Sequence, residues 1–257
     1  MSGFLRGAKP PLVLMVQSRT PEDAIALMRR GIGEGAEAFG VQVCKLLPEH
    51  RTEGAYRRIF AAADGLPLYV TNYRHHTNEG KTDAQLAEEL VQLADCGGEL
   101  IDVMGDYFDP QPGELTTDPK AVEQQLRLIE RIHAHGAEVL MSSHLKAYYP
   151  PERVIAVAKA QQSRGADIAK IVNDDTTAEE AAENLRLCAL LKTELEIPYL
   201  FLSGKRSMVL RRVGPMLGAC CWLCRLGDEE SATKAQPILR RVKAIRDNFE
   251  YYEEDAT

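Results

Sequence analysis

Short apolar runs alternate along the chain with longer segments in which apolar residues recur every three or four positions. A short, continuously apolar run is typical of a strand buried on both faces of a parallel sheet. Spacing by three and four is typical of an amphipathic helix. The predicted strands are Leu12–Val16, Phe39–Val43, Leu68–Asn72, Leu100–Met104, Glu138–Met141, Ile168–Val172, Tyr199–Leu202 and Gly218–Leu223.

Each predicted strand is followed by a predicted helix. The first helix has clear start signals, because Thr20 can cap its N-terminus and Pro21 fits its first turn. The predicted helices are Pro21–Gly31, Arg51–Ala63, Asp83–Cys96, Pro119–His135, Pro151–Arg164, Thr177–Leu195, a shorter one at Ser207–Met216, and Thr233–Phe249. Repeated strand–helix units predict an α/β protein whose parallel sheet closes into a (β/α)8 TIM barrel.

The alternative arrangement is a doubly wound open sheet. Such a sheet usually carries a Gly-rich phosphate-binding turn after its first strand, and Gln17-Ser-Arg-Thr-Pro21 is not one. No linker-like or low-complexity segment interrupts the 257 residues, so we expect residues 1–257 to form one barrel domain. Active sites of such barrels lie at the carboxyl ends of the strands.

Charge and hydropathy exclude some classes of function. The net charge of -7 and the dispersed basic pairs argue against a nucleic-acid surface. No apolar run is long enough to span a membrane, and Met1–Pro11 lacks the apolar segment of a signal peptide. We therefore expect a cytoplasmic protein that contacts neither nucleic acid nor membrane. The acidic stretch Glu250–Asp255 is expected to be a solvated end.

Neither the cysteines nor the histidine pair predicts a metal or redox site. Cys221-Trp-Leu-Cys224 matches a redox motif, but it lies in an apolar run rather than at a helix start, and no second such motif would complete a zinc site. His133 and His135 are two residues apart and do not share a helix face. We expect buried, reduced thiols and no metal.

Lys170 is the most informative residue, because it lies inside the apolar, β-branched run Ile168–Val172. Lysine is rarely buried unless it is paired or used. Burial disfavours the ammonium form and makes the amine a nucleophile, which suggests imine formation with a ketone. The alternative is a lysine whose head reaches solvent from the strand end. His144, just past the preceding strand, could act as general base beside it.

Several segments resemble the type I 3-dehydroquinate dehydratase family. They are Ser143-His144, Gly165-Ala-Asp-Ile-Ala-Lys-Ile171 and Gly204-Lys-Arg-Ser-Met-Val-Leu-Arg-Arg-Val-Gly214, together with Tyr73-Arg74 and Glu79-Gly80, which are similar to the family's Phe-Arg…Glu-Gly-Gly. The resemblance extends from about Leu12 to the C-terminal helix. It is most specific around the fifth to seventh strands.

This resemblance implies a lyase of the shikimate pathway, which serves aromatic amino acid biosynthesis. The enzyme would eliminate water from 3-dehydroquinate, a small keto-carboxylate, to give 3-dehydroshikimate, without a cofactor. By resemblance Lys170 forms the imine, His144 is the general base and acid, and Glu79 orients His144. The substrate-binding residues would be Arg74, Arg211, Gln42, Ser231 and Gln236, with Arg211 on the substrate carboxylate. A homodimer is the assembly we consider.

The chain also departs from the family's pattern. Gly40-Val-Gln42 stands where the family has Glu-x-Arg, and Met104 stands where it usually has Glu. Leu210 and Ser207 replace a Ser and a Gly, and the spacing from Ser231 to Gln236 is one residue longer than in the family's lid. A site that loses partners for a hydroxyl also loses discrimination for it. Three functions therefore stay open: 3-dehydroquinate dehydratase, an imine lyase of the same family acting on another keto-acid or cyclitol, and a catalytically silent homologue that binds a ligand.

Overall fold

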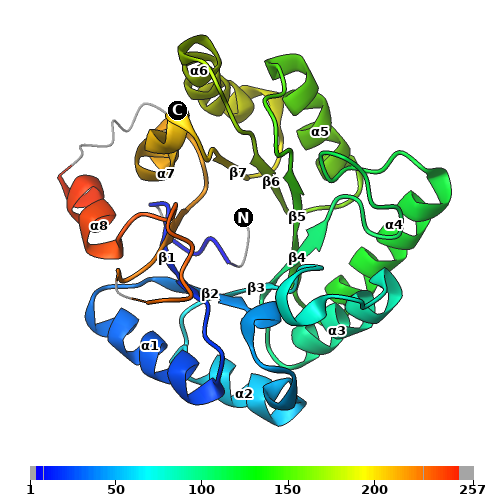
Figure 1. Cartoon of the computed structure of the whole chain (residues 1–257), viewed down its shortest axis with the longest axis vertical. Coiled ribbons are helices and arrows are strands. Elements are labelled where there is room, and N and C mark those ends of the chain that lie inside the picture. Colours follow the sequence, from blue (N-terminus) through cyan, green and yellow to red (C-terminus); the bar gives the residue numbers. More distant parts are fainter. Residues whose placement is uncertain (1–3, 8, 228, 249–257) are drawn as a thin grey trace.

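The computed structural model describes residues 4–7, 9–227 and 229–248. Its eight strands form a single parallel sheet in the order β7-β6-β5-β4-β3-β2-β1-β8, and the helices surround it as an outer ring (Figure 1). This arrangement confirms the predicted (β/α)8 barrel. The strands are β1 (Leu12–Val16), β2 (Ala38–Gln42), β3 (Leu68–Thr71), β4 (Leu100–Met104), β5 (Glu138–His144), β6 (Ile168–Val172), β7 (Tyr199–Leu202) and β8 (Trp222–Cys224).

The outer ring follows the predicted helices closely. Thr20 caps the first helix by accepting a hydrogen bond from the amide of Asp23. The helices are α1 (Pro21–Gly33), α2 (Glu53–Ala61), α3 (Asp83–Asp95), α4 (Pro119–Ala134), α5 (Pro151–Ser163), α6 (Ala178–Glu194), α7 (Leu210–Val213) and α8 (Leu239–Asp247). No described helix has the length and apolar character needed to cross a bilayer.

The predicted boundaries differ from the structure by three residues or more at four elements, and by one or two residues at several others. β5 extends to His144, which is therefore the last residue of the strand rather than a residue beyond it. β8 begins at Trp222 instead of Gly218, since a short 3-10 helix ends at Leu217 and Gly218 adopts a left-handed φ of 114°.

The other two differences follow from prolines. Pro215 lacks a backbone N–H, and the segment predicted as one short helix is divided into two 3-10 turns, Arg206–Val209 and Gly214–Leu217, flanking α7. The last helix begins at Leu239 rather than Thr233, after Pro237, which disfavours helical geometry at Gln236. Its predicted end at Phe249 and the acidic stretch Glu250–Asp255 lie outside the described residues.

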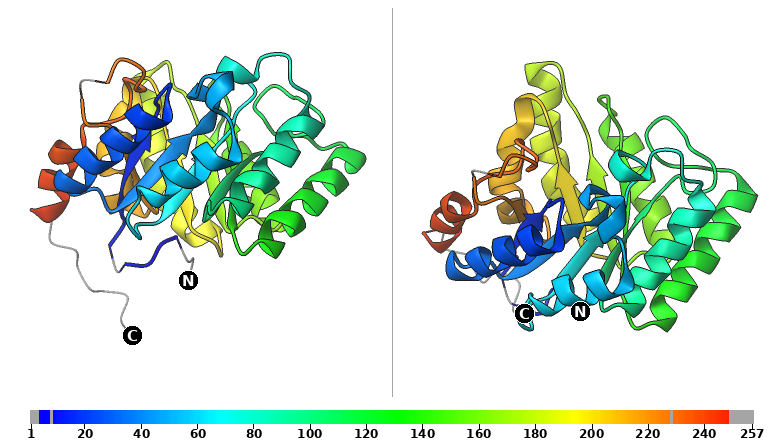
Figure 2. Two further views of the ribbon diagram at one scale, coloured as in Figure 1. Left: turned by 90° about the horizontal axis from the view of Figure 1, so that it is seen from below. Right: turned by 60° about the horizontal axis from the view of Figure 1, so that its bottom comes forward.

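The barrel closes unevenly. β1 pairs with both β2 and β8, whereas β7 meets the segment before β8 through one backbone hydrogen bond, from the amide of Cys220 to the carbonyl of Tyr199 at 2.8 Å. Figure 2 shows from two further sides how the helices pack around the outside of the strands. All six cysteines are free thiols, and Cys221 packs inside the barrel whereas Cys224 packs outside it.

The barrel interior is apolar at the amino-terminal ends of the strands. Phe4 packs there against Tyr69, with ring centroids 6.4 Å apart. The other members of this interior cluster, two of which (Met15 and Leu202) lie nearer the carboxyl ends, are Val13, Met15, Ala38, Leu100, Leu140, Ile168, Leu200, Leu202, Cys221 and Leu223. Because side chains alternate along a strand, the next inward positions, toward the carboxyl ends, include Asp102, Ser142 and Lys170.

Candidate active site

Lys170 lies inside the barrel near the carboxyl end of β6. Its side chain is 5% exposed, so it does not reach solvent from the strand end. Its Nζ is 2.6 Å from the hydroxyl of Tyr73 and 3.1 Å from both the hydroxyl of Tyr69 and Oδ2 of Asp102. An ammonium has three N–H donors, and three partners surround this one.

Asp102 on β4 is the centre of this buried polar cluster. It lies in register beside Leu140 of β5, and its carboxylate accepts hydrogen bonds from Tyr73 at 2.7 Å, from Ser142 at 2.5 Å and from Tyr69. Burial, and next the negative charge of Asp102, raise the pKa of Tyr69 and of Tyr73 well above the ordinary tyrosine value. Both phenols therefore keep their protons at neutral pH.

His144 ends β5 and is held by a carboxylate from the loop between β4 and α4. Its Nδ1 is 2.7 Å from Oε2 of Glu114, and its backbone N–H donates to the same oxygen at 3.1 Å. Lys146 contacts the other carboxylate oxygen at 3.1 Å. Burial opposes ionisation of Glu114, but His144 and Lys146 outweigh it and lower its pKa to about 2. Glu114 is therefore an anion at any physiological pH.

The carboxylate beside His144 in the described structure is that of Glu114, whereas Glu79 is the residue that the family resemblance implies as the one orienting His144. Glu79 is exposed and follows the 3-10 turn His76–Asn78. Glu114 lies in the loop between β4 and α4, which passes over the end of β5. The hydroxyl of Ser143 donates to the carbonyl of Glu114 at 2.7 Å and fixes this loop. Both carboxylates border the same cavity, but the partner of the imidazole is Glu114.

A cavity of about 650 Å³ opens above β3, β4 and β5 at the barrel mouth. This size is in the range of small-molecule sites. The side chain of Tyr73 borders it and packs edge-on against His144 and His75, with ring centroids 5.5 and 5.4 Å away. The lining residues are Tyr73, Arg74, His75, Glu79, Met104, Asp106, Pro110, Gln111, Pro112, Glu114, His144 and Lys146. Lys170 lies behind Tyr73 rather than on the wall itself.

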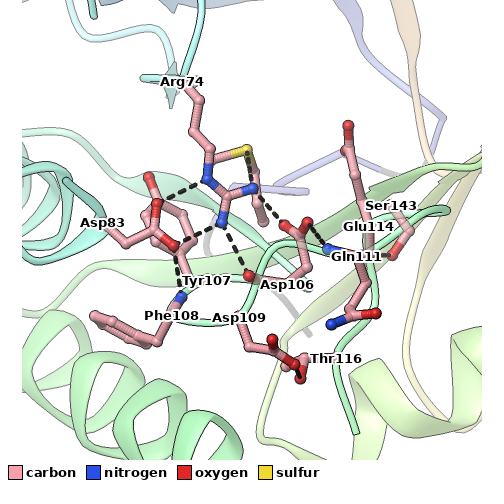
Figure 3. A network of polar contacts seen from close by, with 12 residues as sticks. Arg74, Asp83, Asp106, Tyr107, Phe108, Asp109, Gln111, Glu114, Thr116 and Ser143 are labelled. Atoms are coloured by element: carbon pink, nitrogen blue, oxygen red, sulfur yellow. Dashed lines mark hydrogen bonds and ion pairs between the residues drawn. The ribbon is translucent and has the colours of Figure 1, made fainter. Parts of the chain in front are cut away.

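Arg74 borders this cavity, but its guanidinium is already held by two carboxylates (Figure 3). Its Nε lies 2.7 Å from Oδ1 of Asp83, and its Nη1 lies 2.6 Å from Oδ1 of Asp106. Burial disfavours the charge on Arg74, but the two carboxylates outweigh burial and raise its pKa. In the described structure Arg74 therefore links the loop after β3 to the loop after β4 and to the first residue of α3.

The other predicted substrate-binding residues lie away from this cavity. Arg211 is half-buried on α7 and donates from Nε to the carbonyl of Ser203 at 2.7 Å. Gln42 accepts from Nε2 of Gln17 at 2.5 Å, and Ser231 donates to the carbonyl of Gln17. Ser231 borders a neighbouring cavity of about 720 Å³, which includes His76 and Thr77. Gln236 is buried, and its Oε1 has no hydrogen-bond partner within the described structure.

Sequence reasoning did not assign Tyr69, Tyr73, Asp102 or Glu114 to the site. Asp102 carried a usable signal, because a carboxylate interrupts the apolar run Leu100–Met104 and a buried charge needs a partner. The sequence offers no comparable signal for Glu114, because this residue lies in a long loop. Among the residues with described positions, no three His, Cys, Asp or Glu side chains come together as a metal site.

Known proteins share this barrel. The 3-dehydroquinate dehydratase of Geobacillus kaustophilus HTA426 is 16% identical, with a TM-score of 0.78 over 95% of this chain and 94% of that one. The type I enzyme of Clostridium difficile, solved with covalently modified comenic acid, is 13% identical, with a TM-score of 0.76 over 94% and 92%. The Enterococcus faecalis enzyme is 16% identical, with a TM-score of 0.74 over 95% and 96%.

Sequence comparison adds the family to this likeness in fold. A search of curated proteins found no match. The family model described as Type I 3-dehydroquinase matches residues 14–250, which include every strand except the first two residues of β1. This chain therefore belongs to the type I 3-dehydroquinase family.

Proposed function

We propose that this dehydratase of the type I family converts 3-dehydroquinate to 3-dehydroshikimate through an imine on Lys170. The amine of Lys170 replaces the ketone oxygen, which leaves as water. The iminium then draws electrons from the adjacent carbon, so a base can remove a proton there. The electron pair left on that carbon expels the β-hydroxyl as a second water, and hydrolysis of the imine returns the amine.

The observation that supports this function most directly is the position of the Lys170 amine. It is buried among Tyr73, Tyr69 and Asp102, and Tyr73 in turn borders the cavity of about 650 Å³. A buried amine next to a cavity at the barrel mouth favours an enzyme over the catalytically silent homologue.

His144 is proposed as the base that takes the carbon-bound proton and returns it to the leaving hydroxyl. Glu114 is ionised and accepts a hydrogen bond, so Nδ1 of His144 carries the hydrogen of the neutral imidazole. Nε2 then has the free lone pair that a general base needs. Glu79, which borders the same cavity, is proposed as a substrate contact rather than as the partner of His144.

Arg211, which lies away from the cavity of about 650 Å³ in the described structure, is proposed to bind the substrate carboxylate after a rearrangement. Its described hydrogen bond uses Nε alone, which leaves the two terminal nitrogens for a bidentate contact. Burial lowers the pKa of Arg211, and an incoming carboxylate would compensate for that lost hydration. A neutral amide analogue should then bind much more weakly than the acid, and equal affinity would remove Arg211 from the site.

Gln42, Ser231 and Gln236 are proposed to contact substrate only after a rearrangement. Gln42 and Ser231 are both engaged by Gln17, and the amide oxygen of Gln236 is buried without a hydrogen-bond partner in the described structure. If the segment between β8 and α8 closed over a ligand, Gln42, Ser231 and Gln236 would exchange their present surroundings for contacts with the substrate. Arg74 would need the same kind of release from Asp83 and Asp106.

A second candidate is the same imine chemistry on a different keto-acid or cyclitol. Gly40 favours it, because Met15 occupies the space that a side chain at position 40 would need. Gln42 contributes a neutral amide where the family has a guanidinium. We also propose that residues 1–257 act as one domain, in the cytoplasm, as a homodimer.

The function is tested by adding purified protein to 3-dehydroquinate and following the ultraviolet absorbance of the conjugated product. Wild-type protein should generate product, whereas Lys170→Ala should not. His144→Ala should be slower by about 10²–10⁴-fold, the usual contribution of general acid–base catalysis. No product from 3-dehydroquinate, together with turnover of a less hydroxylated keto-acid, would favour the second candidate.

A further inference from the structure

Tyr73 lies between the cavity and the amine of Lys170. Its hydroxyl is 2.6 Å from Nζ of Lys170 and 2.7 Å from Oδ2 of Asp102, and its side chain borders the cavity of about 650 Å³. Among the described contacts of Nζ, the other two partners are Tyr69 and Asp102, and neither of these borders that cavity. Of these three partners, Tyr73 is thus the one that lies between the amine and a ligand in the cavity.

Imine formation on this lysine requires the movement of protons as well as the attack of nitrogen. The overall change is R–NH3⁺ + O=CR2 → R–NH⁺=CR2 + H2O. A C=N double bond forms in two stages, first its σ and then its π component, as the π and then the σ component of the C=O bond break, and two protons pass from nitrogen to the departing oxygen. No oxidant or further reactant is needed. A group within reach of both nitrogen and oxygen is required to carry those protons.

We infer that Tyr73 is a catalytic residue for imine formation, which relays protons from the Lys170 amine to the departing ketone oxygen. This role rests on the imine mechanism proposed above. At each transfer the phenol gives its proton to the oxygen and takes one from the nitrogen, so it ends unchanged. Asp102 accepts from the phenol and from the amine at the same time, and it holds the two groups together.

The chemistry of the cluster supports this assignment. Burial and the charge of Asp102 raise the pKa of Tyr73, so the phenol is protonated before substrate arrives. His144 is less suited to the same task, because its described contacts are with Glu114 and the edge of Tyr73 rather than with Nζ. Tyr73 therefore transfers protons at the nitrogen during imine formation, and His144 removes the proton from the carbon during elimination.

Tyr69 is a natural control for this inference. Its hydroxyl contacts the same two partners, Lys170 and Asp102, but the residue is 1% exposed and packs against Phe4 in the closed part of the barrel. A ketone in the cavity cannot reach it. Tyr69→Phe therefore removes an equivalent hydroxyl from the cluster without removing the relay.

The test measures incorporation of heavy oxygen from labelled water into the ketone of 3-dehydroquinate, which reports reversible imine formation apart from elimination. Wild-type protein should exchange the oxygen faster than Lys170→Ala. Tyr73→Phe should lower the enzymatic exchange rate by about 10²-fold or more, as expected for lost acid–base catalysis. Tyr69→Phe, which removes a hydrogen bond from the same amine but no contact with the cavity, should lower it by a clearly smaller factor than Tyr73→Phe.

The outcomes separate the relay from the imine mechanism. If wild type exchanges no faster than Lys170→Ala, the imine with 3-dehydroquinate is wrong. If Tyr73→Phe exchanges as fast as wild type, or if both tyrosine variants slow equally, the imine stands and the relay is overturned. Should Tyr73→Phe not fold, Tyr73→Gln supplies an N–H donor that cannot relay a proton, and exchange at the wild-type rate in that variant would also overturn the inference.

Discussion

Nδ1 of His144, the last residue of β5, lies 2.7 Å from Oε2 of Glu114, a residue thirty positions earlier in the loop between β4 and α4. This carboxylate also accepts the backbone N–H of His144 at 3.1 Å, so it fixes both the ring and the end of β5. A carboxylate so placed selects the imidazole tautomer that leaves Nε2 free to act as a base. The proton-transfer half of the site therefore depends on the loop between β4 and α4.

We predict that Glu114→Gln lowers kcat by between about tenfold and about 10³-fold, a part of the ~10²–10⁴-fold that general acid–base catalysis contributes. The amide cannot stabilise the imidazolium that forms when His144 takes a proton. Glu79→Gln is the matched control and should affect kcat much less, because Glu79 is not the partner of this ring. Steady-state kinetics at neutral pH would contradict the assignment if Glu79→Gln caused the larger loss.

The same carboxylate should contribute to the pH dependence of stability. The pKa of Glu114 falls from its ordinary value of 4.5 to about 2 on folding. A depressed pKa stabilises the fold above pH 4.5, and this stabilisation is lost as the pH falls through about 2. The difference in the free energy of unfolding between wild type and Glu114→Gln, measured with urea, should therefore narrow steadily from pH 5 to pH 2. A gap that widens on acidification would mean that the carboxyl is not held as an anion.

Arg74 should matter more for stability than for substrate affinity. Arg74→Ala leaves the side chain of Asp106, 2% exposed, without its guanidinium partner. Breaking a buried ion pair in this way costs about 3–5 kcal/mol. Arg127→Ala is the control, because its pair with Glu123 is exposed and worth about 0.3–0.5 kcal/mol. Thermal unfolding and KM should be measured together, and an unchanged Tm with a strongly raised KM would instead make Arg74 a substrate ligand.

The interior of β2 should limit activity on 3-dehydroquinate. A Cβ at Gly40 would lie 2.2 Å from Sδ of Met15 and 3.1 Å from Cδ1 of Tyr69, so a glutamate fits only if the side chain of Met15 moves away or is shortened. A hydroxyl left without its partner costs about 1–3 kcal/mol. We predict a wild-type kcat/KM for 3-dehydroquinate below about 10⁵ per molar per second.

Restoring the charged pair tests this explanation. Met15→Ala combined with Gly40→Glu and Gln42→Arg should raise kcat/KM for 3-dehydroquinate, whereas Gly40→Glu and Gln42→Arg alone should mainly destabilise the protein. Met15→Ala by itself is the control for the change in volume. A wild-type value well above the stated limit would show that the departures are harmless.

The barrel could be predicted from sequence because its strands and helices have distinct apolar periods. Lys170 was recognisable for the same reason, since it interrupts an apolar strand. Its buried position is confirmed, while its role stays a prediction. The period of two also places Asp102 on the inner face, but only the structure shows that Tyr73 and Tyr69 converge on it. Glu114 could not be found, because a long loop has no period that fixes where a side chain arrives.

The central claim is that the buried amine of Lys170 forms a covalent imine with a keto-carboxylate. Its most direct test is intact-protein mass spectrometry after borohydride reduction in the presence of 3-dehydroquinate and less hydroxylated keto-acids. Wild-type protein should gain the mass of one reduced adduct at Lys170, and His144→Ala should gain it as well. Lys170→Ala should gain nothing. A wild-type protein that turns over its substrate yet never gains this mass would contradict the account.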